Sequence, residues 1–256
     1  MTEDIFLPGL PVNLIVAAYE AAPGNEIASG KFASPESSAA LVANAFGFFL
    51  GRGVLLPPLP GTVDMGWPAS SLALEALVRF PWTGGRHPCL DVLIATGNAL
   101  VGVESKRFEP FRPKGVSDLS EAYWRPLWGP AMTGYERIRD DLKTGTLAYR
   151  HLNATQLIKH AFGLRTAVQP GKRFAGRRPV LFYLFAESDS WPDGKGIPEA
   201  DRLRHREEIE NFRLQTAGNE VFFLSCCYKE LLAGWLTSKH ESIRAHAIAV
   251  AARFRP

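Results

Sequence analysis

The chain has 256 residues, of which 46% are hydrophobic and 21% charged, and its formal net charge is +3. This composition is typical of a soluble globular protein with one large core. It excludes a membrane-spanning protein, because no apolar stretch approaches the roughly 20 residues of a span. The three cysteines are too few for a disulfide framework or a zinc site, and the first residues lack the basic region of a signal peptide. We therefore expect a cytoplasmic protein with no membrane attachment.

Basic residues are concentrated in the middle of the chain. Residues 106–178 contain 15 lysines and arginines against six aspartates and glutamates, a net charge of +9. A block this basic favours a polyanionic partner such as nucleic acid. The alternative is that the charges only form a solvated surface, as charge runs usually do.

A helix is expected to begin at Ser34-Pro35-Glu36, with Ser34 as its N-cap and Pro35 in its first turn. Residues 39–50 are apolar nearly all round, which predicts a buried helix. Glu36 is its only acid, and its simplest role is a favourable contact with the helix dipole. After a connection rich in proline and glycine at 51–70, a strand is predicted over 75–80, with Glu75 at its start.

The most informative stretch runs from Cys89 to Arg107. Two short apolar runs flank Gly97-Asn98, a pair suited to the primed turns of two-residue hairpins. We therefore predict antiparallel strands at 90–96 and 99–106. In that register Val92 faces Val103 and Asp91 faces Glu104, and Asp91, Glu104 and Lys106 project from one side. The opposite side carries a core-facing set of Leu90, Val92, Ile94, Val101 and Val103.

Two carboxylates directly opposite each other repel unless something neutralises them. A divalent cation such as Mg²⁺ does so, because it favours sites with one or two carboxylates and several waters. Lys106 adds a positive charge where the cation and an anionic substrate would meet. The alternative is a solvated hairpin face on which Asp91, Glu104 and Lys106 meet by accident.

At these residues the chain resembles the PD-(D/E)XK nuclease superfamily. Asp91 matches the Asp of the first half-motif, with Pro88 three residues before it instead of adjacent, and residues 104–106 match Glu-x-Lys. The resemblance implies a restriction-endonuclease-like αβββαβ core, in which a mixed central sheet is flanked by helices. It implies that Asp91, Glu104 and the backbone carbonyl of Ser105 hold Mg²⁺ or Mn²⁺. Lys106 would orient the attacking water or stabilise the transition state.

The resemblance also suggests roles for residues outside the hairpin. The helix before the sheet often lends an acid to the metal, which points to Glu36, with Glu75 as the weaker candidate. In some branches the helix after the Glu-x-Lys strand carries a Gln and, four residues on, a Tyr. A helix over residues 153–163 keeps that spacing with Gln156 and His160, although His replaces Tyr. We expect substrate contacts from Arg107, Gln156 and Lys159.

Residues 108–150 are predicted to form an irregular insertion within a single domain of residues 1–256. Aromatic residues alternate there with basic ones, including Lys114, as a groove for unpaired bases requires. The tryptophans could instead anchor a long loop to the core, since Trp is highly buried on average. Beyond it we predict strands at 179–186 and 221–226 and helices over 197–216, 229–236 and 238–252.

The leading prediction is a Mg²⁺- or Mn²⁺-dependent nuclease that hydrolyses phosphodiester bonds, with DNA as the favoured substrate. The alternative is a catalytically inactive nuclease-like module that binds nucleic acid or a protein partner. A homodimer is compatible with either prediction, because enzymes that cut both strands usually need two active sites. No nucleophile elbow, dinucleotide loop or paired His-Cys metal spacing supports another enzyme class.

Overall fold

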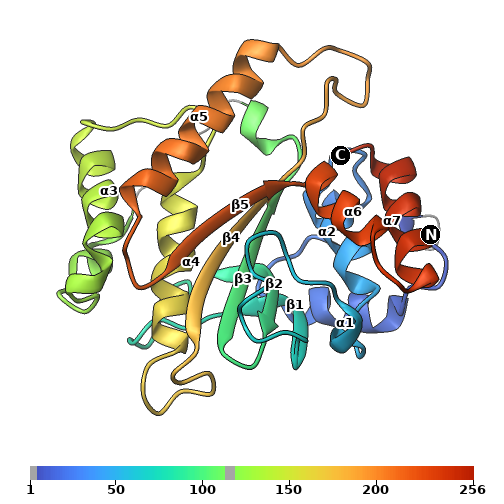
Figure 1. The fold of residues 1–256 in the computed structure, drawn as a ribbon. Helices are drawn as coiled ribbons and strands as arrows, with labels where there is room; N and C mark the ends of the chain where they lie inside the picture. Colours follow the sequence, from blue (N-terminus) through green and yellow to red (C-terminus); the bar gives the residue numbers. More distant parts are fainter. Residues whose placement is uncertain (1–4, 113–118) are drawn as a thin grey trace.

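The computed structural model describes residues 5–112 and 119–256, and a single five-stranded mixed sheet forms its centre (Figure 1). The strands lie side by side in chain order: β1 (Ser71–Leu77), β2 (Cys89–Ala95), β3 (Ala99–Lys106), β4 (Arg178–Phe185) and β5 (Phe222–Cys227). β1, β2 and β3 are antiparallel neighbours, whereas β3, β4 and β5 are parallel. The predicted mixed α/β architecture is confirmed.

Helices cover both faces of this sheet (Figure 1). One face packs against α1 (Val12–Ala21), α2 (Ser38–Gly47), α6 (Tyr228–Leu236) and α7 (Glu241–Phe254). The other packs against α3 (Thr133–Thr144), α4 (Ala154–Ala167) and α5 (Glu199–Gln215). The strand β4 is buried on both faces, since Phe182 enters the first core and Leu181 the second. Its continuous apolar sequence follows from that position.

The helix α2 begins later than predicted, and this displaces Glu36. Its N-cap is Ser37, whose hydroxyl accepts a hydrogen bond from the N–H of Ala40 at 3.0 Å. The N–H of Ser37 bonds the carbonyl of Ser34, which closes a separate turn before the helix. Glu36 therefore lies in that turn and not in the first turn of the helix, so the predicted Ser34 cap is wrong.

The β2–β3 hairpin has the predicted register but not the predicted turn. Val92 pairs with Val103, and the N–H of Thr96 donates to the carbonyl of Ala99 at 2.9 Å. Primed turns need positive φ angles, and neither Gly97 nor Asn98 has one. The reason lies in the preceding loop: the N–H of Gly97 donates to the carbonyl of Gly66 at 2.9 Å, and this contact fixes the backbone.

At the other end of the hairpin, the alternation of side chains breaks at Asp91. Val92 belongs to the core under α2, whereas Leu90 belongs to the core under α4. Opposite Asp91, the strand β1 is interrupted at Glu75. The φ of Glu75 is 48°, which lies outside the range of an extended strand. No ladder pair joins Glu75 to Asp91, although pairs on both sides of them are formed. The prediction that Leu90 shares a face with Val92 is therefore wrong.

The segment at 108–150 combines irregular stretches with helical ones. It contains the helix α3 and short 3₁₀ turns, while Lys114 lies outside the described residues. Trp128 is fully buried and stacks on Phe162 of α4, with ring centroids 4.0 Å apart. Tyr135 is buried as well, with its hydroxyl donating to the carbonyl of Val221. Trp128 therefore anchors this segment to the core, which was the alternative to a base-stacking role.

Within the described ranges, no helix has the length and apolar character that crossing a membrane requires.

Candidate functional site

The open end of the β2–β3 hairpin brings together three of the predicted residues. Glu104 and Lys106 both project toward α4, and their side chains form an ion pair. Asp91 does not project beside them. Its Oδ2 instead accepts a hydrogen bond from the backbone N–H of Ser105 at 2.5 Å. The last ladder pair is Val92 with Val103, so the carboxylate of Asp91 takes the place of the next backbone pair.

His160 of α4 completes the surroundings of Glu104. Its Nε2 lies 2.8 Å from Oε2 of Glu104, while Lys106 contacts Oε1. Glu104 is only 1% exposed and His160 only 2%. A buried carboxylate needs such partners, because an unpaired buried charge is strongly unfavourable. His160 is therefore a buried residue that faces Glu104.

Glu104 and Lys106 shift each other's pKa in opposite directions. Burial acts to raise the pKa of Glu104, but Lys106 and His160 outweigh it and hold the pKa below its usual range. Burial acts to lower the pKa of Lys106, but the carboxylates of Glu104, Asp91 and Glu109 raise it above its ordinary value. Glu104 is therefore ionised and Lys106 charged at neutral pH.

Asp91 and Glu75 are disfavoured as anions. Burial, followed by repulsion from Glu104, raises the pKa of Asp91 well above its ordinary value. Burial also raises the pKa of Glu75 to about 7, and the charge of Glu104 adds to this effect. Its Oε2 lies 3.5 Å from Sγ of Cys89. Perturbed acids of this kind gather at functional sites because the same environment that disfavours their charge favours a cation.

The backbone carbonyl of Ser105 faces the gap between β2 and β3. The N–H and C=O of one residue in an extended strand point to the same side, and the N–H of Ser105 points to Asp91. The side chain of Ser105 lies on the opposite face of the sheet, where its hydroxyl is 2.7 Å from that of Tyr228. Its carbonyl is therefore placed beside Asp91 as expected.

A cavity of about 270 Å³ opens beside Lys106. Gln156 of α4 lines it with Lys106, and so do Glu109, Arg112 and Tyr183. Lys106 and the predicted substrate residue Gln156 thus share one wall. We call this space the Lys106 cavity.

Three other predicted residues lie apart from this group. Glu36 forms an ion pair with Arg112, and its oxygen contacts neither Asp91 nor Glu104. Lys159 is turned toward the ring of Tyr123, with Nζ 6.0 Å from the ring centre. Arg107 lies on the face of the sheet opposite to Lys106, where its guanidinium bonds the carbonyls of Pro35 and Phe254. The structure therefore does not bring the proposed third acid and two of the substrate contacts to the site.

Sequence reasoning missed two residues of the site. His160 was considered only for its spacing from Gln156. Because His160 follows Gln156 by four residues, both lie on the same face of the helix, and this spacing was the available signal. Glu109 follows Lys106 by three residues, and its Oε2 accepts the N–H of Arg107 at 2.8 Å. No motif marks Glu109, since its position depends on a 3₁₀ turn directly after β3.

The ligand types at this site suit a hard cation, whereas the positions of the side chains do not converge on one point. Two carboxylates and a backbone carbonyl at one end of the hairpin are the ligand types that Mg²⁺ and Mn²⁺ prefer. Among the described residues, however, no three His, Cys, Asp or Glu side chains converge as metal ligands. Both oxygens of Glu104 are held by Lys106 and His160. A bound cation would therefore have two side-chain ligands, and water would supply most of the others.

Comparisons with protein-family models, with curated proteins and with solved structures find no match to this chain.

Proposed function

We propose that the protein is a divalent-metal-dependent nuclease, with DNA as the favoured substrate. The observation that carries the proposal is the junction of Asp91, Glu104 and Lys106 at one end of an antiparallel hairpin, beside an accessible cavity. The order α2, β1, β2, β3, α4, β4 agrees with the αβββαβ core of the restriction-endonuclease-like fold. The net charge of +9 over residues 106–178 suits a polyanionic substrate.

Asp91, Glu104 and the carbonyl of Ser105 would hold Mg²⁺ or Mn²⁺. When bound, such an ion lowers the pKa of a water ligand and neutralises charge on the phosphate. Lys106 is charged and lines the cavity, so its ammonium group donates hydrogen bonds to a phosphate oxygen or orients the attacking water. His160 holds Glu104 in place, and Gln156, which lines the same cavity as Lys106, contacts the substrate.

The third acid of the site is Glu75 in this proposal, not Glu36. The charge of Glu75 acts on Asp91, whereas Glu36 is paired with Arg112. Glu75 also has a backbone φ of 48°, which is rare for residues other than glycine, and such strained residues cluster at functional sites.

The experiment that tests the proposal is Mn²⁺- and Mg²⁺-dependent cleavage of linear, circular and single-stranded DNA, with RNA as a further substrate. Lys106→Ala should reduce cleavage by about 10³-fold or more while the fold stays intact, because the substitution removes the ammonium group that faces the phosphate. Glu104→Ala should abolish cleavage as well. Lys239→Ala, which removes an exposed lysine between α6 and α7, is the matched control. Full activity in Lys106→Ala would disprove this mechanism.

One observation favours the second candidate, a nuclease-like module that binds nucleic acid without cutting. Both oxygens of Glu104 are already engaged by Lys106 and His160, so a metal must compete with both side chains. Thermal unfolding with and without Mn²⁺ separates the two functions, because a ligand that binds only the native state raises Tm. A rise that disappears in Asp91→Asn supports the nuclease. Nucleic-acid binding with no effect of Mn²⁺ supports the module.

A further inference from the structure

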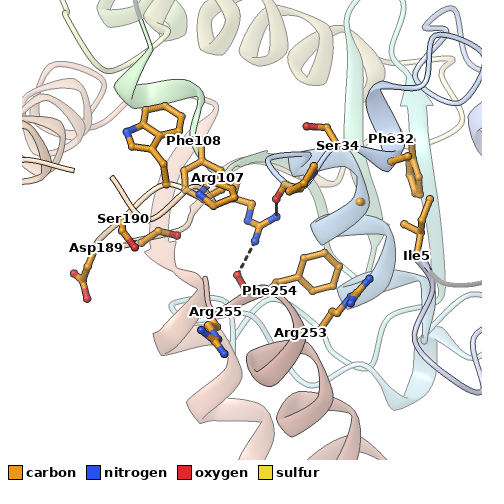
Figure 2. A pocket seen from close by; sticks show the side chains of 17 residues that line it. Ile5, Phe32, Ser34, Arg107, Phe108, Asp189, Ser190, Arg253, Phe254 and Arg255 are labelled. Atoms are coloured by element: carbon orange, nitrogen blue, oxygen red, sulfur yellow. Dashed lines mark hydrogen bonds between the residues drawn. The ribbon is translucent and has the colours of Figure 1, made fainter. Parts of the chain in front are cut away.

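A second cavity, of about 680 Å³, lies on the opposite side of residues 106–109 from the Lys106 cavity. Its walls come from the turn before α2, the end of α7 and the loop after β4 (Figure 2). Arg107 and Phe108 line it, whereas Lys106 and Glu109 line the Lys106 cavity. We call this space the Arg107 cavity. Its volume falls within the range of small-molecule sites, about 300–1,000 Å³.

The wall of this cavity contains a buried cation without a carboxylate partner. Arg107 is 8% exposed. Its guanidinium donates to two carbonyls, that of Pro35 at 2.5 Å and that of Phe254 at 2.7 Å (Figure 2). Its Nε has no hydrogen-bond acceptor among the described residues. Carbonyls carry no net charge, and among the described residues no carboxylate forms an ion pair with this guanidinium, although the charge of Glu109 acts on it. A buried cation without an ion-pair partner is unfavourable. The excess positive charge therefore favours an anion in the cavity.

A second buried donor lies in the same wall. Ser188 is also 8% exposed, and its hydroxyl has no hydrogen-bond partner within the described part of the chain. Buried polar groups normally have partners, so an unpaired one indicates a missing ligand or water. The wall thus holds two buried donors without a partner among the described residues, one from the segment directly after β3 and one from the loop after β4.

The remaining charges at this cavity are also mainly positive. Arg253 and Arg255 line it from the end of α7 (Figure 2). Asp189 is the only acid among the lining residues, and its carboxylate already forms an ion pair with Arg202. Three arginines therefore line the cavity, against one acid among the described lining residues.

We propose that the Arg107 cavity binds a phosphate-bearing small molecule of nucleotide size. The planar guanidinium groups and the Ser188 hydroxyl match the oxygens of a phosphate. The volume is far larger than one phosphate ion, and Phe32 and Phe254 offer apolar surface to the rest of the ligand. The proposal does not depend on nuclease activity, because none of the lining residues is a proposed metal ligand.

Isothermal titration calorimetry in EDTA tests this proposal with adenosine 5′-monophosphate, inorganic phosphate and adenosine as probes. The nucleotide should bind saturably and adenosine should not. If inorganic phosphate binds as tightly as the nucleotide, the ligand is free phosphate. If inorganic phosphate binds more weakly than the nucleotide, the ligand is a phosphate ester. The absence of saturable binding of both phosphate probes at millimolar concentration would overturn the proposal.

Arg255→Asn is the principal variant, because Arg255 is exposed and Asn tolerates its φ of 45°. It should weaken nucleotide binding about tenfold, the effect of one lost charged hydrogen bond. Arg173→Asn removes an exposed arginine from the loop before β4, at the opposite end of that strand, and should leave affinity unchanged. Equal weakening in both variants would indicate non-specific attraction and overturn the proposal.

Two further variants separate this site from its surroundings. Arg107→Lys keeps the charge but loses the planar fork, so binding should fall about tenfold or more while far-ultraviolet circular dichroism stays unchanged. If this variant unfolds, Arg255→Asn still decides the outcome. Lys106→Ala should bind the nucleotide as the wild type does. Loss of binding in Lys106→Ala would place the ligand in the Lys106 cavity and overturn the proposal.

Discussion

The two ends of the β2–β3 hairpin differ in what holds them together. At the closed end, backbone hydrogen bonds pair the strands, and the N–H of Gly97 bonds the carbonyl of Gly66. At the open end, ladder pairing stops at Val92 and Val103, and a side chain of Asp91 takes over the N–H of Ser105. The closed end contributes stability. The open end lacks this pairing and contains three buried or half-buried acids, of which Glu104 disfavours the charged forms of Asp91 and Glu75.

This difference indicates where function and stability oppose each other in the molecule. The closed end satisfies every local rule except the expected turn type, because its turn is fixed by the neighbouring loop. The open end breaks three rules, with a positive φ at Glu75, an interrupted alternation at Asp91 and buried like charges. Departures of this kind concentrate at functional sites.

Gly66→Ala should break the closed end and have the largest effect on stability. A Cβ on Gly66 would lie 2.9 Å from the backbone nitrogen of Asn98, and its φ of +68° disfavours any L side chain. Clash and strain together should reduce the free energy of unfolding by about 3 kcal/mol. Gly51→Ala is the control, because Gly51 has a φ of +73° with nothing nearby. Equal urea midpoints for the two variants would contradict the role of the turn contact.

Glu75→Gln should change how the stability of the open end depends on pH. The pKa of Glu75 is about 7 in the folded protein against an ordinary 4.5. The protonated form is therefore favoured by folding, and its stabilisation is present below pH 4.5 and lost as the pH rises through 7. The wild type should lose up to about 3 kcal/mol of unfolding free energy over this window from this group, and Glu75→Gln should not. Urea unfolding in EDTA at pH 5 and pH 8 measures the difference, and parallel pH profiles would contradict it.

Asp91→Asn should have the smallest effect on stability, and in the opposite direction. Asn can still accept the N–H of Ser105, but it removes the repulsion that raises the pKa of Asp91. The metal-free variant should therefore be about 1 kcal/mol more stable at pH 7. It should also lose any stabilisation by Mn²⁺. A variant that is less stable than the wild type in EDTA would show that Asp91 is not strained in the free protein.

The sequence predicted four of the strands closely because their signals are local, whereas β1 was predicted over 75–80 and lies at Ser71–Leu77. Alternating and continuous apolar runs placed β2, β3, β4 and β5 within one or two residues, and the hairpin register followed from Gly97-Asn98. The beginning of α2 was misplaced because two serines, Ser34 and Ser37, both precede suitable helix sequence. Only a tertiary contact decided between them, since the hydroxyl of Ser38 bonds Glu109.

The site was predictable where it depends on the hairpin and unpredictable where it depends on packing between distant elements. Glu104 and Lys106 lie two residues apart on one strand, so their common face followed from the period of a strand. His160 contacts Glu104 only because α4 crosses the sheet at that point. Glu36 forms an ion pair with Arg112 instead of joining the site. Neither contact leaves a pattern in the sequence.

The segment that leaves β3 forms the wall between the two cavities. Lys106 lies on one side, Arg107 on the other, and Glu109 on the first again. Because strand side chains alternate, deleting Ser105 from the end of β3 would exchange Lys106 and Arg107 between the two faces of the sheet. The lysine would then enter the arginine-rich space, and an arginine would meet Glu104. Substitutions in this segment affect one cavity at a time, whereas a change of its length by one residue affects both at once. Its length is therefore more constrained than any single side chain in it.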